Sequence, residues 1–323
     1  MTGTWSALRR RILTPDVSAT KLAVRGFHEK SPAARELLEA VGASFLAGYA
    51  EAAQASDPLD AEAALERVAR SFRGFAYEGA TMAFAVRDGL PLGRTDHVAR
   101  FLAGRADAHI YMAYVGVGWA MARLPRFRWS KLYAPDPLLR WLVLDGYGFH
   151  QAYFHTERYV RQQFRSPRFS WPPDDQWGYA NRAIDQGIGR AAWFVGGADP
   201  RVVAALLDAF EPARRADLYS GAGLAATYAG GADAGELTWF FEHAGAYRSQ
   251  LAQGSAFAAG ARVRAGLVAP HNEVATEVFC GLSPADATKV TDRALPDPTA
   301  SHDRPAYEVW RQRIADELAS LRA

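Results

Sequence analysis

Apolar side chains recur every three or four positions along most of the chain, which is the spacing of one face of an α-helix. One such stripe is formed by Val202, Val203, Leu206, Leu207 and Phe210. Alternating β-branched runs joined by Asn-Gly or Asp-Gly turns, which would indicate β-hairpins, are missing from the sequence. The pattern predicts an all-α protein, with helices over residues 32–54, 60–86, 94–122, 136–165, 178–195, 200–211, 214–229, 234–261, 272–280 and 304–321.

A polar residue followed by glycine recurs at a steady interval in the C-terminal half, at Gln186-Gly187, Ser220-Gly221 and Gln253-Gly254. The glycines are 34 and 33 residues apart (221 − 187 and 254 − 221). Double glycines end the first two units, at Gly196-Gly197 and Gly230-Gly231. Such a period is typical of stacked helical hairpins, because each hairpin needs a neighbour to cover its apolar face. We predict α-solenoid-like helical-hairpin repeats, with each polar-glycine pair at the head of a helix.

The N-terminal half has only irregular relatives of these pairs, at Glu78-Gly79 and Asp145-Gly146. We therefore predict one continuous domain with three parts: an irregular helical region over residues 1–170, the repeats over 171–295 and a C-terminal capping helix over 296–323. The capping helix has an apolar stripe that would cover the last exposed repeat. Its members are Tyr307, Trp310, Ile314 and Leu318.

Composition narrows the class of protein. The chain has 37 Lys and Arg against 35 Asp and Glu, a formal net charge of +2. This balance does not favour a nucleic-acid partner, although arginine and aromatic residues interleave over residues 126–129.

The single cysteine, Cys280, leaves no disulfide framework and is expected to be a buried, inert thiol. The longest apolar run, residues 111–122, is too short to span a bilayer, and no secretory signal is recognisable. We expect a cytoplasmic protein without a transmembrane segment.

Titratable side chains of possible catalytic use occur in two apolar helices. His150 lies three residues before Tyr153, so the two share a helical face. Glu78 lies in an otherwise apolar helix, where a carboxylate needs a partner. We predict His150 and Glu78 as acid–base catalysts, with Tyr153 and Arg190 positioning the substrate or stabilising charge. A structural alternative stays open for each. His150 would be a buried histidine whose hydrogen bonds are made within the protein, and Glu78 would form an ion pair with Arg190.

No metal or cofactor is expected. His150 and His155 are five residues apart, which places them roughly 140° apart around a helix and makes them a poor pair of ligands. The glycine-rich motifs of dinucleotide and nucleotide-phosphate binding are missing.

A further set of aromatic, amide and acidic residues recurs near the polar-glycine pairs and predicts a binding groove. Such a groove would suit a long, apolar, conjugated molecule with one oxygenated end. The alternative for the glutamines is that they cap neighbouring carbonyl groups. The predicted substrate-binding residues are Asp145, Gln186, Trp193, Tyr219, Tyr228, Gln253 and Phe257.

Several blocks of the sequence, taken in order, resemble a known family. The blocks are Tyr77-Glu78-Gly79-x-x-Met82-Ala83, Asp145-Gly146-x-Gly148-Phe149-His150, Gln186-Gly187-x-Gly189-Arg190-x-x-Trp193-Phe194, Asp217-Leu218-x-Ser220-Gly221-x-Gly223-Leu224-Ala225 and Tyr228-Ala229-Gly230-Gly231. Over about residues 20–295 the chain resembles the uncharacterised group that includes the enediyne biosynthesis protein UnbL. The resemblance implies a role in making or maturing a polyketide-derived enediyne core, and it assigns no catalytic residue.

Two hypotheses follow. In the first, the protein is a biosynthetic enzyme that binds a conjugated polyene intermediate and promotes proton transfer or a redox modification of it. In the second, it is a non-catalytic helical-repeat protein that sequesters the intermediate or bridges partner enzymes of the same gene cluster. The repeats favour the second hypothesis, and the ionisable residues in apolar helices favour the first. We prefer the first, chiefly because of the family resemblance.

Overall fold

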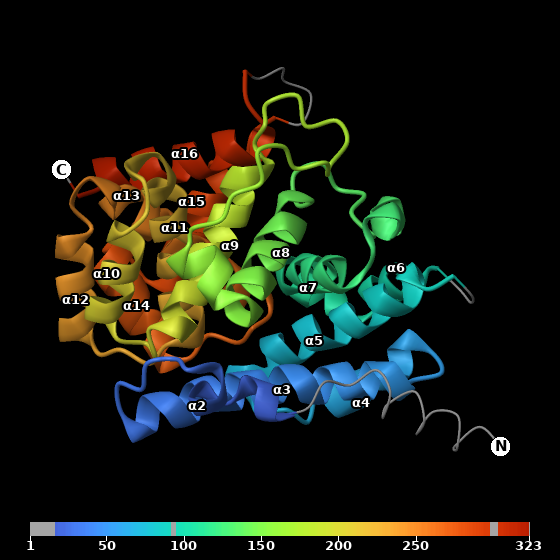
Figure 1. The fold of residues 1–323 in the computed structure, drawn as a ribbon. Coiled ribbons are helices and arrows are strands. Elements are labelled where there is room, and N and C mark those ends of the chain that lie inside the picture. Colours follow the sequence, from blue (N-terminus) through green and yellow to red (C-terminus); the bar gives the residue numbers. More distant parts are fainter. Residues whose placement is uncertain (1–16, 92–94, 298–302, 323) are drawn as a thin grey trace. The chain divides into compact units, whose positions relative to one another are not determined.

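The computed structural model describes residues 17–91, 95–297 and 303–322, and every regular element in these ranges is a helix (Figure 1). The prediction of an all-α protein is confirmed. The chain divides into two compact units, one of residues 1–26 and 39–147 and the other of residues 27–38 and 148–323. The predicted boundaries at 170/171 and 295/296 stay predictions. Among the described residues, no helix is long and apolar enough to cross a membrane.

The first unit contains most of the helices of the N-terminal half. Two of its helices, α3 and α8, continue into the second unit. Its α-helices are α2 (Leu22–Arg25), α3 (Pro32–Gln54), α4 (Glu62–Leu65), α5 (Arg70–Gly89), α6 (His97–Leu102), α7 (Ile110–Arg123) and α8 (Trp141–Phe154). Four 3-10 helices connect them: η1 (Val17–Thr20), η2 (Pro58–Ala61), η3 (Arg105–His109) and η4 (Arg126–Lys131).

Close backbone contacts hold this unit together. A Cβ added at Gly79 would lie 1.9 Å from the carbonyl oxygen of Phe45, so α5 touches α3. A Cβ at Gly116 would lie 2.4 Å from the carbonyl oxygen of Glu78, so α7 touches α5. Glu78 and Gly79 are therefore interior residues of α5, and Asp145 is likewise interior to α8. The prediction that these pairs open helices is wrong, because glycine serves here to let helices approach rather than to start them.

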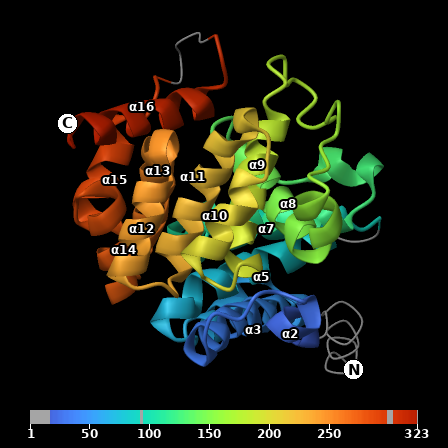
Figure 2. The same ribbon diagram turned by 60° about the vertical axis from the view of Figure 1, so that its left-hand side comes forward.

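The second unit arranges its helices in two rows. Helices α9, α11 and α13 lie side by side in one row, α10, α12 and α14 form a second, and α16 crosses one end of the first (Figure 2). Proline stands at the first turn of α10, α11, α14 and α15, where its missing N–H costs no helical hydrogen bond. The helices are α9 (Ala180–Val195), α10 (Pro200–Asp208), α11 (Pro212–Ala229), α12 (Ala234–His243), α13 (Arg248–Arg264), α14 (Pro270–Cys280), α15 (Pro284–Arg293) and α16 (Ala306–Ser320). A π-helical turn, Glu157–Arg161, follows α8, and the 3-10 turn η6, Gly245–Tyr247, precedes α13.

The glycine period corresponds to contacts between the helices of the first row. A Cβ at Gly221 would lie 1.9 Å from the carbonyl oxygen of Gln186, and one at Gly254 would lie 1.8 Å from that of Ser220. Each glycine thus packs on the polar residue of the preceding polar-glycine pair. These pairs are interior to α9, α11 and α13, so their predicted position at helix heads is wrong. That the helices form a regular repeat stays a prediction.

Several helix boundaries also differ from those predicted. The predicted helix over 60–86 is divided into α4 and α5, and the one over 94–122 into α6 and α7. Residues 234–261 were expected as one helix, but α12 ends at His243 and η6 intervenes, with Gly245 at a positive φ of 53°. Helix α15 was not predicted, although Ser283 caps it and Pro284 begins it. The apolar stripe predicted for the last helix is confirmed, because all four of its members are buried.

Candidate functional site

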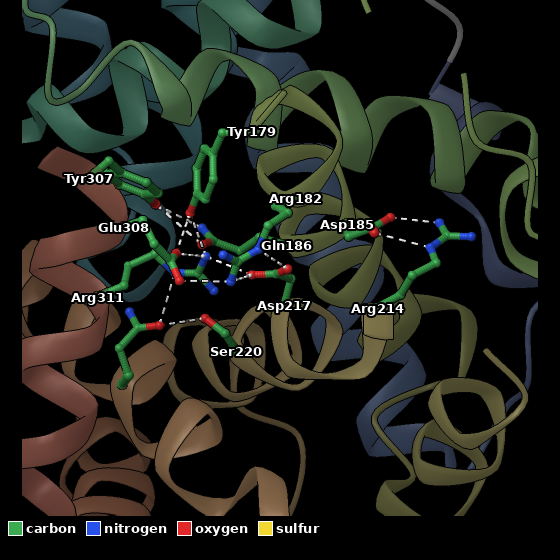
Figure 3. A network of polar contacts seen from close by, with 11 residues as sticks. Tyr179, Arg182, Asp185, Gln186, Arg214, Asp217, Ser220, Tyr307, Glu308 and Arg311 are labelled. Carbon is green, nitrogen blue, oxygen red and sulfur yellow. Dashed lines mark hydrogen bonds and ion pairs between the residues drawn. The ribbon is translucent and has the colours of Figure 1, made fainter. Parts of the chain in front are cut away.

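A buried set of charged and polar side chains joins α16 to α9, α11 and α13 (Figure 3). Glu308 and Arg311 lie three residues apart on α16 and therefore share a helical face. We call this set the α16 network. Its members are Tyr179, Arg182, Gln186, Asp217, Ser220, Gln253, Tyr307, Glu308 and Arg311.

Arg311 is the centre of the α16 network and is only 4% exposed. Its Nη1 atom lies 2.7 Å from the Tyr179 hydroxyl, 2.7 Å from Asp217 Oδ1 and 3.2 Å from Glu308 Oε2. Tyr179 in turn donates its hydroxyl proton to Glu308 Oε2 at 2.7 Å. One guanidinium therefore links α16 to α11 and to the residue that precedes α9.

Arg182 supplies the second positive charge. Its guanidinium meets Asp217 with two hydrogen bonds, of 2.9 and 3.1 Å, and reaches Glu308 Oε1 at 2.8 Å. Two cations thus face two carboxylates and the charges balance; Arg182 is 39% exposed, and the other three charged side chains are buried. Balance matters because an unpaired buried charge costs several kcal/mol.

Burial and neighbouring charges fix the protonation of two members of the network. Burial raises the pKa of Tyr179 well above its ordinary value, with Arg311 opposing the shift, so the phenol stays neutral. Burial alone would lower the pKa of Arg311, but Tyr179, Asp217 and Glu308 outweigh it and the pKa rises. Tyr179 and Arg311 therefore both keep their protons. Groups that keep their protons are suited to holding α16 in place rather than to transferring a proton.

The amides of the network differ in how completely they are bonded. Gln186 exchanges hydrogen bonds with the Tyr307 hydroxyl, at 3.1 and 3.3 Å. The Oε1 atom of Gln253 accepts from Ser220 at 2.7 Å and from Arg311 Nε at 3.3 Å. The Nε2 atom of Gln253 is buried and has no hydrogen-bond partner in the described part of the chain. Ser220 and Arg311 both donate to the Gln253 oxygen. In a flipped amide the NH2 group would face the Arg311 guanidinium, and two donors would then meet without an acceptor.

A second buried ion pair joins α9 to α11. Arg214 binds Asp185 with two hydrogen bonds, of 2.6 and 3.0 Å, and donates to the carbonyl oxygen of Gln163 at 2.8 Å. Burial raises the pKa of Asp185, and the hydrogen bond from Arg214 opposes this. Within the first row, buried charges thus reinforce the contact made by Gly221.

Three of the four predicted catalytic residues lie in the second unit and contact aromatic rings of α8. Tyr153 stacks on Phe149 with ring centroids 5.8 Å apart, and the Arg190 guanidinium lies 5.1 Å from the centre of the Phe149 ring. His150 contacts Phe154, with ring centroids 4.8 Å apart. All of these side chains except Phe154 are buried. We call this group the Phe149 cluster.

The two remaining acidic candidates belong to the first unit. Glu78 is buried in α5, and Asp145 is buried in α8. Their predicted roles, and the predicted pairing of Glu78 with Arg190, stay predictions.

The predicted binding aromatics of the second unit are engaged within its core. Trp193 donates its indole N–H to the carbonyl oxygen of Gly230 at 2.9 Å, and Tyr219 donates to Asp208 Oδ1 at 2.8 Å. The Arg262 guanidinium lies 3.9 Å from the centre of the Tyr228 ring. Phe257 packs on Trp310 of α16, with ring centroids 4.6 Å apart. Of the predicted binding set, Gln186 and Gln253 are the residues that meet in the α16 network.

Sequence reasoning missed the charged members of the α16 network. A helical spacing was nevertheless available as a signal. Arg182 precedes Gln186 by four residues, Asp217 precedes Ser220 by three, and Arg311 follows Tyr307 by four.

The lone cysteine is buried, as predicted. Its Sγ donates to the carbonyl oxygen of Ala252 at 3.4 Å, and burial raises its pKa to about 12. A thiol with so high a pKa is a poor nucleophile at neutral pH. In residues 17–91, 95–297 and 303–322, no group of three His, Cys, Asp or Glu side chains could hold a metal ion.

Comparison with known proteins places the chain in a family. Residues 4–318 match the family described as "Protein of unknown function (DUF1702)". The chain belongs to this family. No curated protein and no solved structure matches it. The family assignment covers nearly the whole chain, including the α16 network and the Phe149 cluster.

Below about pH 6.5 the protein is expected to lose stability through His271 in α14. Burial lowers the pKa of His271, and the charge of Arg262 lowers it further. The unfolded chain therefore binds a proton more readily than the folded one, so stability is full above the unfolded pKa and falls as the pH drops through 6.5. Thermal unfolding followed by circular dichroism, at about pH 7 and about pH 5, measures the effect. His271→Gln should flatten this pH dependence, whereas His155→Gln, a change at an exposed residue, should leave it. Equal slopes for wild type and His271→Gln would contradict the assignment.

Proposed function

We propose that the protein acts in the biosynthesis of a polyketide-derived natural product of the enediyne type. In this proposal it binds a conjugated polyene intermediate and moves a proton on it. The observation that carries the proposal is the Phe149 cluster, in which aromatic rings, a histidine and an arginine are linked by ring contacts. Aromatic side chains with few polar groups suit an apolar conjugated ligand.

The chemistry of these side chains favours proton transfer. His150 would remove a proton from a carbon next to the conjugated system, and Tyr153 would position the substrate. Arg190 would stabilise the negative charge that develops on the oxygenated end. Returning the proton at another carbon shifts a double bond and leaves the electron count unchanged. A redox modification would require an added electron acceptor, so proton transfer is the simpler reaction. Glu78, which belongs to the first unit, is proposed separately as an acid–base residue.

The biological setting of the proposal comes from the sequence. The ordered blocks of the chain resemble the group that includes the enediyne biosynthesis protein UnbL. Two of these blocks contain His150 and Arg190 themselves. The resemblance supports the product class, and the Phe149 cluster supports the role of the residues.

Deuterium incorporation tests the proposal. The purified protein is incubated in D2O with the polyene released by the polyketide synthase of the same gene cluster, with and without the neighbouring gene products. The polyene is then examined by liquid chromatography and mass spectrometry. We expect protein-dependent deuterium uptake or a new isomer. Because general acid–base groups typically contribute about 10²–10⁴-fold, His150→Asn should slow the reaction by roughly 100-fold or more.

His155→Asn is the matched control, since His155 lies five residues further along and is exposed. It should retain the wild-type rate, and both variants should keep the helical circular dichroism. Full activity in His150→Asn and in Glu78→Gln would remove the acid–base assignment. A polyene that binds, with a shifted absorption spectrum, but never exchanges protons would favour the non-catalytic alternative, in which the protein sequesters the intermediate or bridges partner enzymes.

A further inference from the structure

A short basic turn after α7 exposes one aromatic ring in the first unit. Phe127, the second residue of η4, is 79% exposed, the largest exposure among the exposed large hydrophobic residues of the described chain. Arg123, Arg126 and Lys131, all within four residues of it in the chain, are exposed. Residues 108–135 contain no Asp or Glu. We call Phe127 with Arg123, Arg126, Arg128 and Lys131 the η4 patch.

Anchored neighbours hold the ring in this position. Arg128 donates from Nε to the carbonyl oxygen of Gly89 and from Nη2 to that of Leu90, both at 2.7 Å. Trp129 is buried and donates its indole N–H to the carbonyl oxygen of Met121 at 3.1 Å. The turn is therefore fastened by the two residues that directly follow Phe127. Leu90, beside the fastening point, is itself 40% exposed.

The charge of the η4 patch is not neutralised within the protein. In the described part of the chain, none of its four cations pairs with a carboxylate; Arg128 bonds to carbonyl oxygens and Arg126 lies over the Trp129 ring. Other arginines of the same unit do pair, as Arg73 does with Glu66 and Arg100 with Asp57. Four clustered positive charges without counterions create a local field that attracts an anionic partner.

We propose that the η4 patch docks on a membrane surface that bears anionic headgroups. Phe127 enters the boundary between headgroups and acyl chains, and the surrounding cations contact the headgroups. A single-stranded nucleic acid would require successive exposed rings for stacking, but Trp129 is buried. A protein partner would require a broad apolar centre, but here one ring projects among cations. The inference does not depend on the proposed polyene chemistry.

Vesicle flotation with the full-length protein tests this proposal. Vesicles of phosphatidylcholine with phosphatidylglycerol should bind the protein, vesicles of phosphatidylcholine alone should bind it much less, and added salt should weaken binding. Arg126→Gln with Lys131→Gln should weaken binding by roughly 25-fold, since each cation near an anionic surface contributes roughly fivefold. Phe127→Ser should weaken it by roughly tenfold or more.

Matched controls use exposed residues of the same unit. Val24→Ser removes another exposed apolar side chain, and Arg105→Gln removes an exposed arginine that pairs with Glu62 and Glu66. Both controls should bind as wild type does. The proposal is overturned if anionic vesicles do not bind the protein, if the η4 variants bind as well as the controls, or if a single-stranded oligonucleotide binds while the vesicles do not. All of these changes are at exposed positions, and circular dichroism verifies that each variant is folded.

Discussion

Replacing Arg311 with methionine is expected to lower the free energy of unfolding by about 3–5 kcal/mol. Arg311 is buried and lies within hydrogen-bonding distance of Tyr179, Asp217 and Glu308. Methionine fills a similar length but leaves two buried carboxylates to share Arg182 alone. The loss is therefore dominated by uncompensated charge rather than by a missing contact. Urea unfolding followed by circular dichroism measures it.

Two further variants separate charge from packing. Adding Glu308→Gln to Arg311→Met should recover part of the loss, because the one carboxylate left in excess is then removed. Arg161→Met removes an exposed arginine from its pair with Glu157 and should cost less than about 0.5 kcal/mol. If Arg311→Met were as mild as Arg161→Met, the α16 network would not fasten α16.

The helices could be predicted from the sequence because their apolar spacing is a local property. The role of a glycine within a helix is not a local property. Gly221 and Gly254 look like helix-start signals when the sequence is read alone, yet each is a contact with the helix before it. Whether a glycine begins a helix or lets a neighbour approach depends on what lies across from it. Helix α15 was missed although local signals for it exist, since Ser283 and Pro284 mark its start.

The α16 network was beyond prediction for a related reason. Arg182 and Asp217 each read as ordinary charges on amphipathic helices, and so do Glu308 and Arg311. They meet only because α16 returns across the first row, bringing Arg311 to partners 94 and 132 residues earlier in the chain. The Phe149 cluster was partly predictable, because His150 and Tyr153 share a face of one helix. The approach of Arg190 to Phe149 depends on how α8 and α9 pack.

Replacing Gly254 with alanine should destabilise the protein by about 3 kcal/mol or more, the upper part of the range for overpacked cores. The added Cβ would lie 1.8 Å from the carbonyl oxygen of Ser220 and 2.9 Å from the amide nitrogen of Leu224. Both are backbone atoms, so α11 and α13 would have to separate. Alanine also favours the helix by up to about 1 kcal/mol, and the clash outweighs this gain.

Replacing Gly260, which also lies in α13, with alanine is expected to have the opposite effect on stability. There an added Cβ would find only the Thr291 hydroxyl oxygen, 3.5 Å away, an ordinary contact. Without a clash, helix propensity decides the sign, and Gly260→Ala should stabilise the protein by about 0.5–1 kcal/mol. Thermal and urea unfolding of both variants, followed by circular dichroism, should therefore move in opposite directions from wild type. If Gly254→Ala were stabilising like Gly260→Ala, the close backbone contact of α11 with α13 would be wrong. The 33-residue interval between Gly221 and Gly254 would then need an explanation other than helix packing.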